Sequence, residues 1–269
     1  MAGLGYVVGA PDLFWRIERN WESAHDEAGL QASMGMIQKF DFGTGVADAV
    51  AAFEAVRSLP EVKGGTGVIG FCLGGTFAWL TAAATQPDVA ISYYGSGVAG
   101  ALDQADAVSC PVIFHFGDSD PYLPNDQVDA IRARVGDRET VEIHVQPAGH
   151  AFDNHESAMF WNEAAAAAAW ERTVAFLQRC LPIEQAGCRL HRRQTDVGVG
   201  GRGRDAPPGR AHEKALGDEE RLVHVLHRLG FLAHADRQRR EADRAPAEVP
   251  ADHRQDGAVD LVEPAVVEA

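Results

Sequence analysis

The sequence predicts an α/β fold in which a mostly parallel sheet is covered by helices on both faces. Short apolar runs alternate with longer amphipathic segments up to about Cys180, which is typical of parallel sheets with crossover helices. One run, residues 67–71, stops at a cysteine with glycines on both sides, where a helical pattern begins. The hydrophobic fraction of 46% is enough for a globular core. In such folds ligands bind beyond the carboxyl ends of the strands.

The elements follow from apolar spacing and from the turn residues that bound each segment. Strands are predicted at residues 6–8, 67–71, 89–95, 110–117 and 141–146. The stretch after the first strand reads as a Pro-Asp loop and then a polar segment. Helices are predicted at residues 44–59, 73–85, 125–135 and 157–180. In the first of these, Val46, Val50, Phe53 and Val56 fall on one face at spacings of three and four.

The composition changes after about Cys180, so we predict an α/β domain over residues 1–184 and a separate tail over 185–269. The tail is rich in Arg, Ala, Gly, His and Asp and poor in aromatic residues. Only residues 219–232 carry a helical apolar pattern. The rest cannot bury enough apolar area to offset its ordering entropy. Two interpretations stay open, a naturally disordered tail and an extension read out of frame. Its histidines fit no metal-ligand spacing.

Charge and cysteine usage exclude several classes of partner. The formal net charge is −15, which argues against nucleic acid because that interface needs a basic patch. No apolar run reaches the ~20 residues that span a bilayer, so no membrane partner is expected. The beginning of the chain lacks signal-peptide features. The four cysteines show no C-x-x-C pair. We therefore expect reduced thiols and a cytoplasmic location.

Residues 70–74 form the pattern G-x-C-x-G between a predicted strand and a predicted helix. This is the nucleophile-elbow pattern with cysteine in place of serine. Small residues at Gly70 and Gly74 let the strand and helix approach closely. The helix amino terminus favours a thiolate at Cys72, and the backbone N–H of Leu73 can face an oxyanion. The alternative is a buried structural cysteine, but the context favours a catalytic one.

A thiol nucleophile needs a base, and His150 is the best-placed histidine. It stands in the loop "PAGHAF" after the predicted strand at 141–146, where the site should lie. The other histidines of the first 180 residues compare poorly with it. His115 and His144 lie inside strands, His25 lies in a polar loop, and His155 begins the last helical region.

The base in turn needs an acid that orients it. The loop "GDSDPYLP" after the predicted strand at 110–117 supplies Asp118 and Asp120. We favour Asp120, because it lies further beyond the strand and Pro121 favours a fixed turn after it. The other aspartate is expected to order that turn.

The segments "GFCLGG", "HFGDSDPYLP" and "PAGHAF" resemble the dienelactone hydrolase family (carboxymethylenebutenolidases), which has the α/β-hydrolase fold. The resemblance covers about residues 5–180, and "PDLF" and "YYG" add to it. It implies a catalytic triad of Cys72, Asp120 and His150. It also implies hydrolysis of a small-molecule ester or lactone through a thioester, with no cofactor and no metal.

The chain departs from the family pattern in two places. Family members carry strands and a Q-E-x-F-G-like loop before the segment that matches "GYVVGAPDLF". We therefore expect an N-terminally truncated fold with an exposed sheet edge and possible self-association through it. Family enzymes that hydrolyse dienelactone also have an arginine shortly after the triad histidine, where this chain has Asp153 and Asn154.

The leading hypothesis is a hydrolase of ester or lactone bonds that uses a Cys-Asp-His triad. The first alternative is an inactive or impaired hydrolase-fold protein that acts, if at all, in binding. The second alternative is a redox-sensing thiol protein, although no resolving cysteine lies near Cys72 in the sequence.

Overall fold

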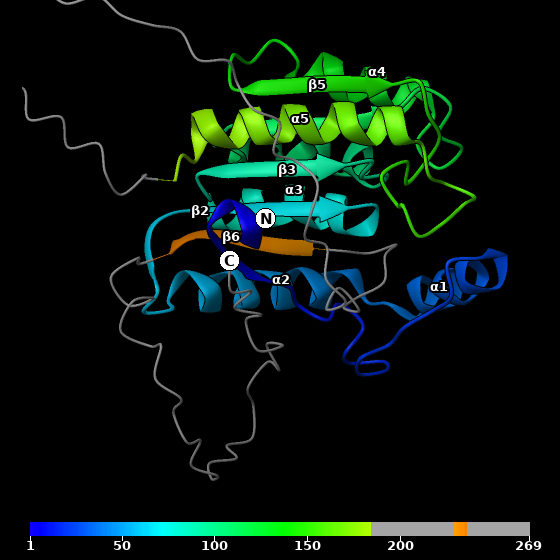
Figure 1. Ribbon diagram of the computed structural model, residues 1–269, viewed down its shortest axis with the longest axis horizontal. Coiled ribbons are helices and arrows are strands. Elements are labelled where there is room, and N and C mark those ends of the chain that lie inside the picture. The colour runs from blue at the N-terminus through cyan, green and yellow to red at the C-terminus, as the bar shows by residue number, and fades with distance from the viewer. Residues whose placement is uncertain (184–228, 236–269) are drawn as a thin grey trace, which may run out of the picture. The chain divides into compact units, whose positions relative to one another are not determined.

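The computed structural model describes residues 1–183 and 229–235, which form a six-stranded sheet with helices on both faces (Figure 1). The strands run in the order β1-β6-β2-β3-β4-β5. Their bounds are β1 Tyr6–Gly9, β2 Val62–Phe71, β3 Val89–Tyr93, β4 Val112–Gly117, β5 Val141–Gln146 and β6 Leu229–Ala235. The predicted α/β fold with a mostly parallel sheet is confirmed.

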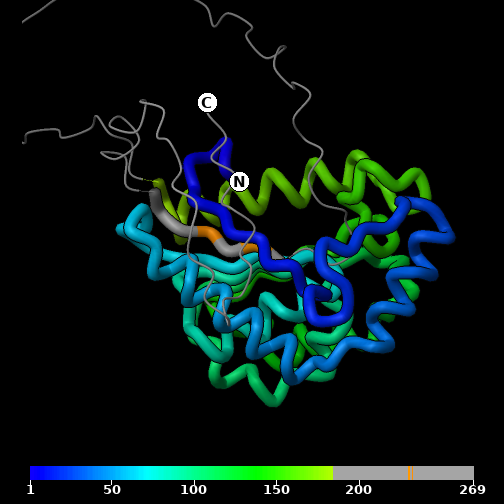
Figure 2. Tube along the Cα trace, turned by 90° about the horizontal axis from the view of Figure 1, so that it is seen from below, coloured from blue at the N-terminus to red at the C-terminus, as the bar shows by residue number. Residues whose placement is uncertain are grey.

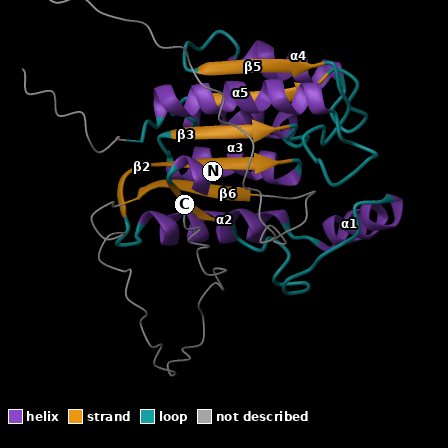
Figure 3. Ribbon diagram, viewed as in Figure 1, coloured by secondary structure: helices purple, strands orange, loops and turns teal. Residues whose placement is uncertain are grey.

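Helices separate the strands along the chain (Figure 3). They are α1 Glu27–Lys39, α2 Phe42–Arg57, α3 Leu73–Thr85, α4 Asn125–Val135 and α5 Glu163–Cys180, with short 3₁₀ helices at Ala2–Leu4 and Val98–Ala107. Side-chain caps define where three of them begin, because a carboxylate or amide oxygen accepts a free backbone N–H of the first turn. Asp26, Asp41 and Asn162 do this for α1, α2 and α5.

Strands β2 to β5 are parallel to one another, so their carboxyl ends meet at one edge of the sheet. The register pairs Ile69 with Ile91 and Ile91 with Ile113, which places one apolar row across three strands. Each of these side chains is at most 4% exposed. This buried row holds the strands in register and thereby fixes the positions of the loops that follow them.

Helices cover the two faces of the sheet unequally (Figure 2). Helix α5 packs Phe176 and Leu177 against the face that carries Ile91. The opposite face packs against α2, α3 and α4 and contains the larger cluster, which includes Phe53, Phe77, Trp79, Phe114, Val128 and Ile131. Burial on both faces explains why the central strands read as continuous apolar runs in the sequence.

Strand β6 corrects two expectations about the second part of the chain. A helical pattern was expected over 219–232, but residues 229–235 form a strand, and 219–228 lie outside the described residues. The segment also belongs to the sheet, so the α/β domain does not stop at 184. Residues 184–228 and 236–269 likewise lie outside the described part, and a disordered tail there stays a prediction. Long-range pairing decided the outcome, because residues 231–234 pair with β1 and residues between 229 and 235 pair with β2.

The exposed sheet edge expected at the first strand is filled on one side, although β1 remains the outermost strand of the described sheet. Strand β6 runs antiparallel between β1 and β2, so β1 has a hydrogen-bonded neighbour on one side. Leu232 is fully buried in a cluster with Tyr6 and Ile69. The hydroxyl of Tyr6 donates to the carbonyl oxygen of Leu181 at 2.6 Å, which ties β1 to the end of α5.

Three helical features differ from the sequence prediction. Helix α1 lies in the stretch that was expected to be a polar loop. It was not predicted because its apolar residues are too sparse to give a clear stripe. The 3₁₀ helix Val98–Ala107 was not predicted. Helix α5 begins at Glu163 and not at 157, because Asn162 accepts the N–H of Ala165 at 3.1 Å and so sets the first turn. None of the helices in the described residues is long and apolar enough to cross a bilayer.

Candidate active site

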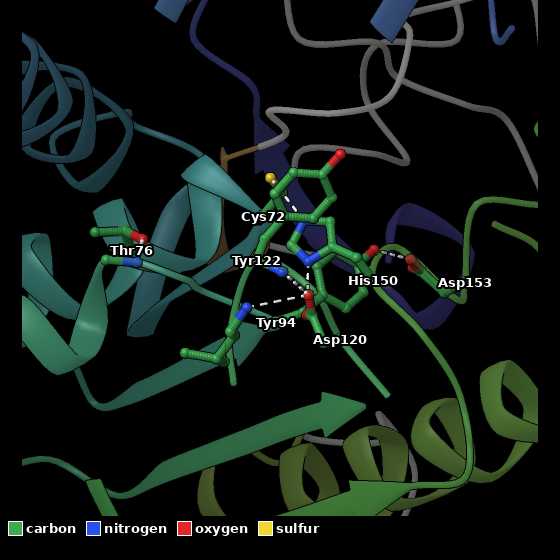
Figure 4. Close-up of polar contacts among 9 residues, drawn as sticks. Cys72, Thr76, Tyr94, Asp120, Tyr122, His150 and Asp153 are labelled. Carbon is green, nitrogen blue, oxygen red and sulfur yellow. Dashed lines mark hydrogen bonds and ion pairs between the residues drawn. The ribbon is translucent and has the colours of Figure 1, made fainter. Parts of the chain in front are cut away.

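The carboxyl edge of the parallel strands brings together residues from four separate loops (Figure 4). Cys72 follows β2, Tyr94 follows β3, Asp120 follows β4 and His150 follows β5. The sequence predicts Cys72, Asp120 and His150 as site residues, and in the structure His150 contacts both Cys72 and Asp120.

Cys72 occupies a sharp corner between β2 and α3. Its φ of 54° lies in the left-handed region, which a non-glycine residue adopts only when the surrounding structure imposes it. A Cβ on Gly70 would lie 1.8 Å from the carbonyl oxygen of Gly74, and a Cβ on Gly75 would lie 2.6 Å from that of Tyr93. Glycine is therefore required where strand and helix touch. The corner leaves the Cys72 side chain partly exposed at the start of the helix.

His150 connects the thiol to a carboxylate. Its Nε2 lies 3.0 Å from Sγ of Cys72, and its Nδ1–H donates to Oδ2 of Asp120 at 2.7 Å. Burial alone disfavours the charged imidazole, but the Cys72 thiolate and the Asp120 carboxylate outweigh it and raise the pKa of His150 to about 10. The site therefore favours an imidazolium beside a thiolate.

Asp120 is held by its own turn as well as by His150. Its Oδ1 accepts the backbone N–H of Tyr122 at 2.8 Å and that of Leu123 at 3.2 Å. These bonds leave Oδ2 free to face the imidazole, and the residue is only 5% exposed. The other candidate, Asp118, is exposed and accepts from the hydroxyl of Ser119 at 2.8 Å. The geometry thus favours Asp120 over Asp118 as the partner of His150.

Two tyrosine rings lie against the imidazole, and the sequence analysis assigned neither of them to the site. The ring centroid of Tyr94 is 5.0 Å from that of His150, and the centroid of Tyr122 is 4.9 Å from it. Tyr94 is buried and its hydroxyl donates to Asp153, whereas Tyr122 is 41% exposed. Each follows a strand that ends at the site, and they lie in the segments "YYG" and "HFGDSDPYLP" that carry the family resemblance.

The backbone is strained at three positions around this site. Among the described non-glycine residues with positive φ are Cys72 at 54°, Tyr94 at 38° and Ala151 at 51°. Each one immediately follows a strand or a triad candidate. Such strain gathers where a structure must aim particular side chains, which fits a site built for chemistry.

Several other histidines and cysteines of the described residues make contacts outside the Cys72–His150 pair. His115 is buried on β4, where its Nε2 lies 3.0 Å from the hydroxyl of Thr173 on α5, and His144 is on β5. Both strand placements were predicted. His155 lies in the loop before α5 and not in a helical region. Burial raises the pKa of the Cys110 thiol to about 12, as a core cysteine requires.

Within the described residues, no three His, Cys, Asp or Glu side chains are grouped as metal ligands would be. The arrangement of Cys72, His150 and Asp120 instead has the contacts that covalent catalysis needs: a nucleophile, a base beside it and an acid that orients the base.

Comparison with known proteins shows the family of the chain. The profile described as "Dienelactone hydrolase family" matches residues 1–181. The chain belongs to the dienelactone hydrolase family. It is 32% identical to "Carboxymethylenebutenolidase 1" of Cupriavidus pinatubonensis over 178 residues, which is 66% of this chain and 76% of that protein. It is 33% identical to "Carboxymethylenebutenolidase" of Pseudomonas sp. strain P51 over 188 residues, which is 70% of this chain and 79% of that protein.

A third relative, "Carboxymethylenebutenolidase" of Pseudomonas knackmussii, is 34% identical over 64% of this chain and 74% of that protein. The family resemblance drawn from three short motifs is therefore confirmed over the same part of the chain. This dienelactone hydrolase family member has the α/β-hydrolase fold, and family membership supports an enzyme that hydrolyses lactones or esters.

Proposed function

We propose that this protein hydrolyses ester or lactone bonds with Cys72 as nucleophile, His150 as base and Asp120 as the residue that orients His150. The observation that carries the proposal is the unbroken chain of contacts from Sγ through the imidazole to the carboxylate, with distances of 3.0 and 2.7 Å. Each step of the reaction follows from that arrangement.

In the first step the thiolate of Cys72 attacks the carbonyl carbon of the substrate, and a C–S bond forms while the carbonyl π electrons move to oxygen. The N–H of Leu73 is the first backbone donor of α3, so it has no acceptor within the helix and can stabilise this oxyanion. As the tetrahedral intermediate collapses, the C–O bond to the alcohol breaks and the His150 imidazolium donates its Nε2 proton to the alkoxide. A thioester remains on Cys72.

In the second step His150 is neutral and acts as a general base. It removes a proton from a water molecule, whose oxygen attacks the thioester carbonyl. Collapse of the second tetrahedral intermediate breaks the C–S bond and returns the electron pair to Cys72 as thiolate, beside a newly protonated His150. Asp120 accepts the Nδ1–H throughout, which keeps Nε2 aimed at the reacting atoms.

The substrate class follows from this chemistry and from the relatives. Those relatives carry the name carboxymethylenebutenolidase, and we propose a small-molecule ester or lactone for this chain. In the reaction with a lactone, the alcohol formed in the first step stays attached to the acyl group. Residues Asp153 and Asn154 after His150 distinguish this chain from family enzymes that bind a carboxylate with arginine there, so we propose an acyl group without a required carboxylate.

Hydrolysis of a p-nitrophenyl ester tests the proposal. The wild-type protein should release p-nitrophenol with turnover, and Cys72→Ala should abolish release. Cys180→Ala is the matched control, because it removes a thiol at the end of α5 and should leave the rate unchanged. A wild-type protein without turnover would instead support the alternative of an inactive, binding hydrolase-fold protein. Equal turnover by wild type and Cys72→Ala would show that the nucleophile is assigned wrongly.

A further inference from the structure

Tyr94 forms a second polar link to the loop that carries His150. Its hydroxyl donates to Oδ1 of Asp153, which lies three positions after His150 and 59 positions after Tyr94 (Figure 4). The link therefore joins the carboxyl end of β3 to the loop after β5. It bypasses β4, the strand that lies between them in the sheet.

The ring of Tyr94 fills the space between this link and the imidazole. Its centroid lies 5.0 Å from that of His150 and 5.3 Å from that of Phe152, with Phe152 in an edge-on arrangement. Tyr94 is only 1% exposed and Phe152 is fully buried. One side of the imidazole therefore rests on a buried ring that cannot move without displacing the core.

The environment also keeps the phenol protonated. Burial, followed by the negative charge of Asp153 and that of Cys72, raises the pKa of Tyr94 well above its usual value. The protonated hydroxyl can then donate to the Asp153 carboxylate. A charge-assisted hydrogen bond of this kind is stronger than one between neutral groups, so it suits a role as an anchor.

The loop needs an anchor because its own backbone is strained. Ala151, immediately after His150, has a φ of 51°, and Tyr94 itself has a φ of 38°. The N–H of Tyr94 donates to the carbonyl oxygen of His115 at 2.7 Å, which fixes Tyr94 to β4. Tyr94 is thus held at its backbone by the sheet and holds the His150 loop through its hydroxyl.

We propose that Tyr94 and Asp153 are a positioning pair for His150, in which the hydroxyl–carboxylate bond fixes the loop and the phenol ring fixes the imidazole plane. The inference rests on the proposed function, because it takes His150 as the catalytic base. Neither residue is assigned contact with the substrate. They act by keeping Nε2 at its distance of 3.0 Å from Sγ of Cys72.

Three variants separate the parts of this pair. Tyr94→Phe keeps the ring and removes the donor, Asp153→Ala removes the acceptor, and Asp153→Asn keeps an acceptor oxygen without the charge. A misplacement of about 1 Å can cost ~10²-fold in rate. We expect Tyr94→Phe and Asp153→Ala each to lower kcat on a p-nitrophenyl ester by about 10- to 100-fold with KM little changed.

Two further results are expected from the pair acting as one unit. The double variant should be no slower than the worse single variant, because both changes break the same bond. Asp153→Asn should recover kcat to within about threefold of wild type, because it still accepts the hydroxyl proton. The control is Tyr93→Phe. Tyr93 is the buried neighbour whose hydroxyl lies 2.7 Å from that of Thr173, on the α5 face. The Tyr93→Phe substitution should leave kcat nearly unchanged.

The second readout is the pH dependence of Cys72 alkylation by iodoacetamide, which needs no turnover. Tyr94→Phe and Asp153→Ala should make alkylation more dependent on pH than in wild type, because a misplaced imidazolium stabilises the thiolate less. A merely structural role would lower thermal stability without changing this profile. An unchanged kcat together with an unchanged alkylation profile in both variants would overturn the proposed positioning role of Tyr94 and Asp153. If the wild-type protein has no esterase activity, the proposed function is rejected. The pH profile of Cys72 alkylation would still decide the role of Tyr94 and Asp153.

Discussion

His150 Nε2 lies 3.0 Å from Cys72 Sγ, although the two residues are 78 positions apart in the chain. The contact exists because β2 and β5 run parallel in one sheet and their following loops meet at the same edge. Thiolate and imidazolium stabilise each other at this distance, and the first two predictions below depend on that pairing.

The first prediction concerns the reactivity of Cys72 as a function of pH. The pKa of His150 is raised to about 10, so the imidazolium is retained throughout the neutral range and is lost only as the pH rises through about 10. Iodoacetamide should therefore alkylate Cys72 at nearly the same rate from about pH 6.5 to 8.5. In His150→Ala the rate should rise about tenfold per pH unit below an ordinary thiol pKa of ~8.5.

Peptide mapping provides the internal control for that experiment. Cys110 is 6% exposed, and burial raises its pKa to about 12. It should be alkylated much more slowly than Cys72 at every pH. Faster labelling of Cys110, or a steep pH dependence at Cys72 in wild type, would contradict an activated thiolate.

The second prediction separates the two aspartates of the loop after β4. Asp120→Asn replaces the carboxylate that receives the Nδ1–H of His150, so it should lower kcat/KM by ~10²–10⁴-fold. Asp118→Asn is the matched control, because Asp118 is exposed and its carboxylate accepts from the hydroxyl of the neighbouring Ser119. The kcat/KM of Asp118→Asn should lie within about threefold of the wild-type value. A larger loss in Asp118→Asn than in Asp120→Asn would reverse the assignment.

The third prediction tests the elbow through its backbone. A methyl group on Gly70 would lie 1.8 Å from the carbonyl oxygen of Gly74, and neither backbone can yield without moving Cys72. Gly70→Ala should therefore destabilise the protein by about 3 kcal/mol or more and remove esterase activity. Gly100→Ala is the control, since nothing lies within 4 Å of its added Cβ. Comparable melting temperatures for the two variants would contradict the close contact of strand and helix.

The fourth prediction concerns β6, the strand between β1 and β2. Leu232 is fully buried beside Tyr6 and Ile69, so Leu232→Ala should cost ~2–5 kcal/mol and lower the melting temperature. Leu4→Ala makes the same chemical change at a side chain that is 40% exposed, and it should have little effect. If Leu232→Ala melts at the wild-type temperature, β6 does not belong to the folded sheet.

The parts of the site that the sequence predicted depend on local patterns. Gly70, Cys72 and Gly74 stand within five consecutive residues, and the strand before them and the helix after them can both be recognised from apolar spacing. His150 and Asp120 each follow a clear strand, so their position at the carboxyl edge followed from the parallel order alone.

The parts that the sequence did not predict depend on contacts between distant segments. The bond from Tyr94 to Asp153 spans 59 positions, and no spacing rule connects them. Residues 229–232 carry the end of a helical apolar pattern, yet they form a strand because β1 and β2 supply partners on both sides. Helix α1 was not predicted because its apolar stripe is weak, although its capping residue Asp26 can be seen in the sequence.

The most direct test of the account is intact-protein mass spectrometry of the covalent intermediate. His150→Ala lacks the base for the second step, so after mixing with excess p-nitrophenyl acetate it should accumulate one acetyl group, and peptide mapping should place that group on Cys72. Hydroxylamine should release it, as expected for a thioester. Acetylation at another residue, or an unmodified Cys72 in a variant that still releases p-nitrophenol, would contradict nucleophilic catalysis by Cys72.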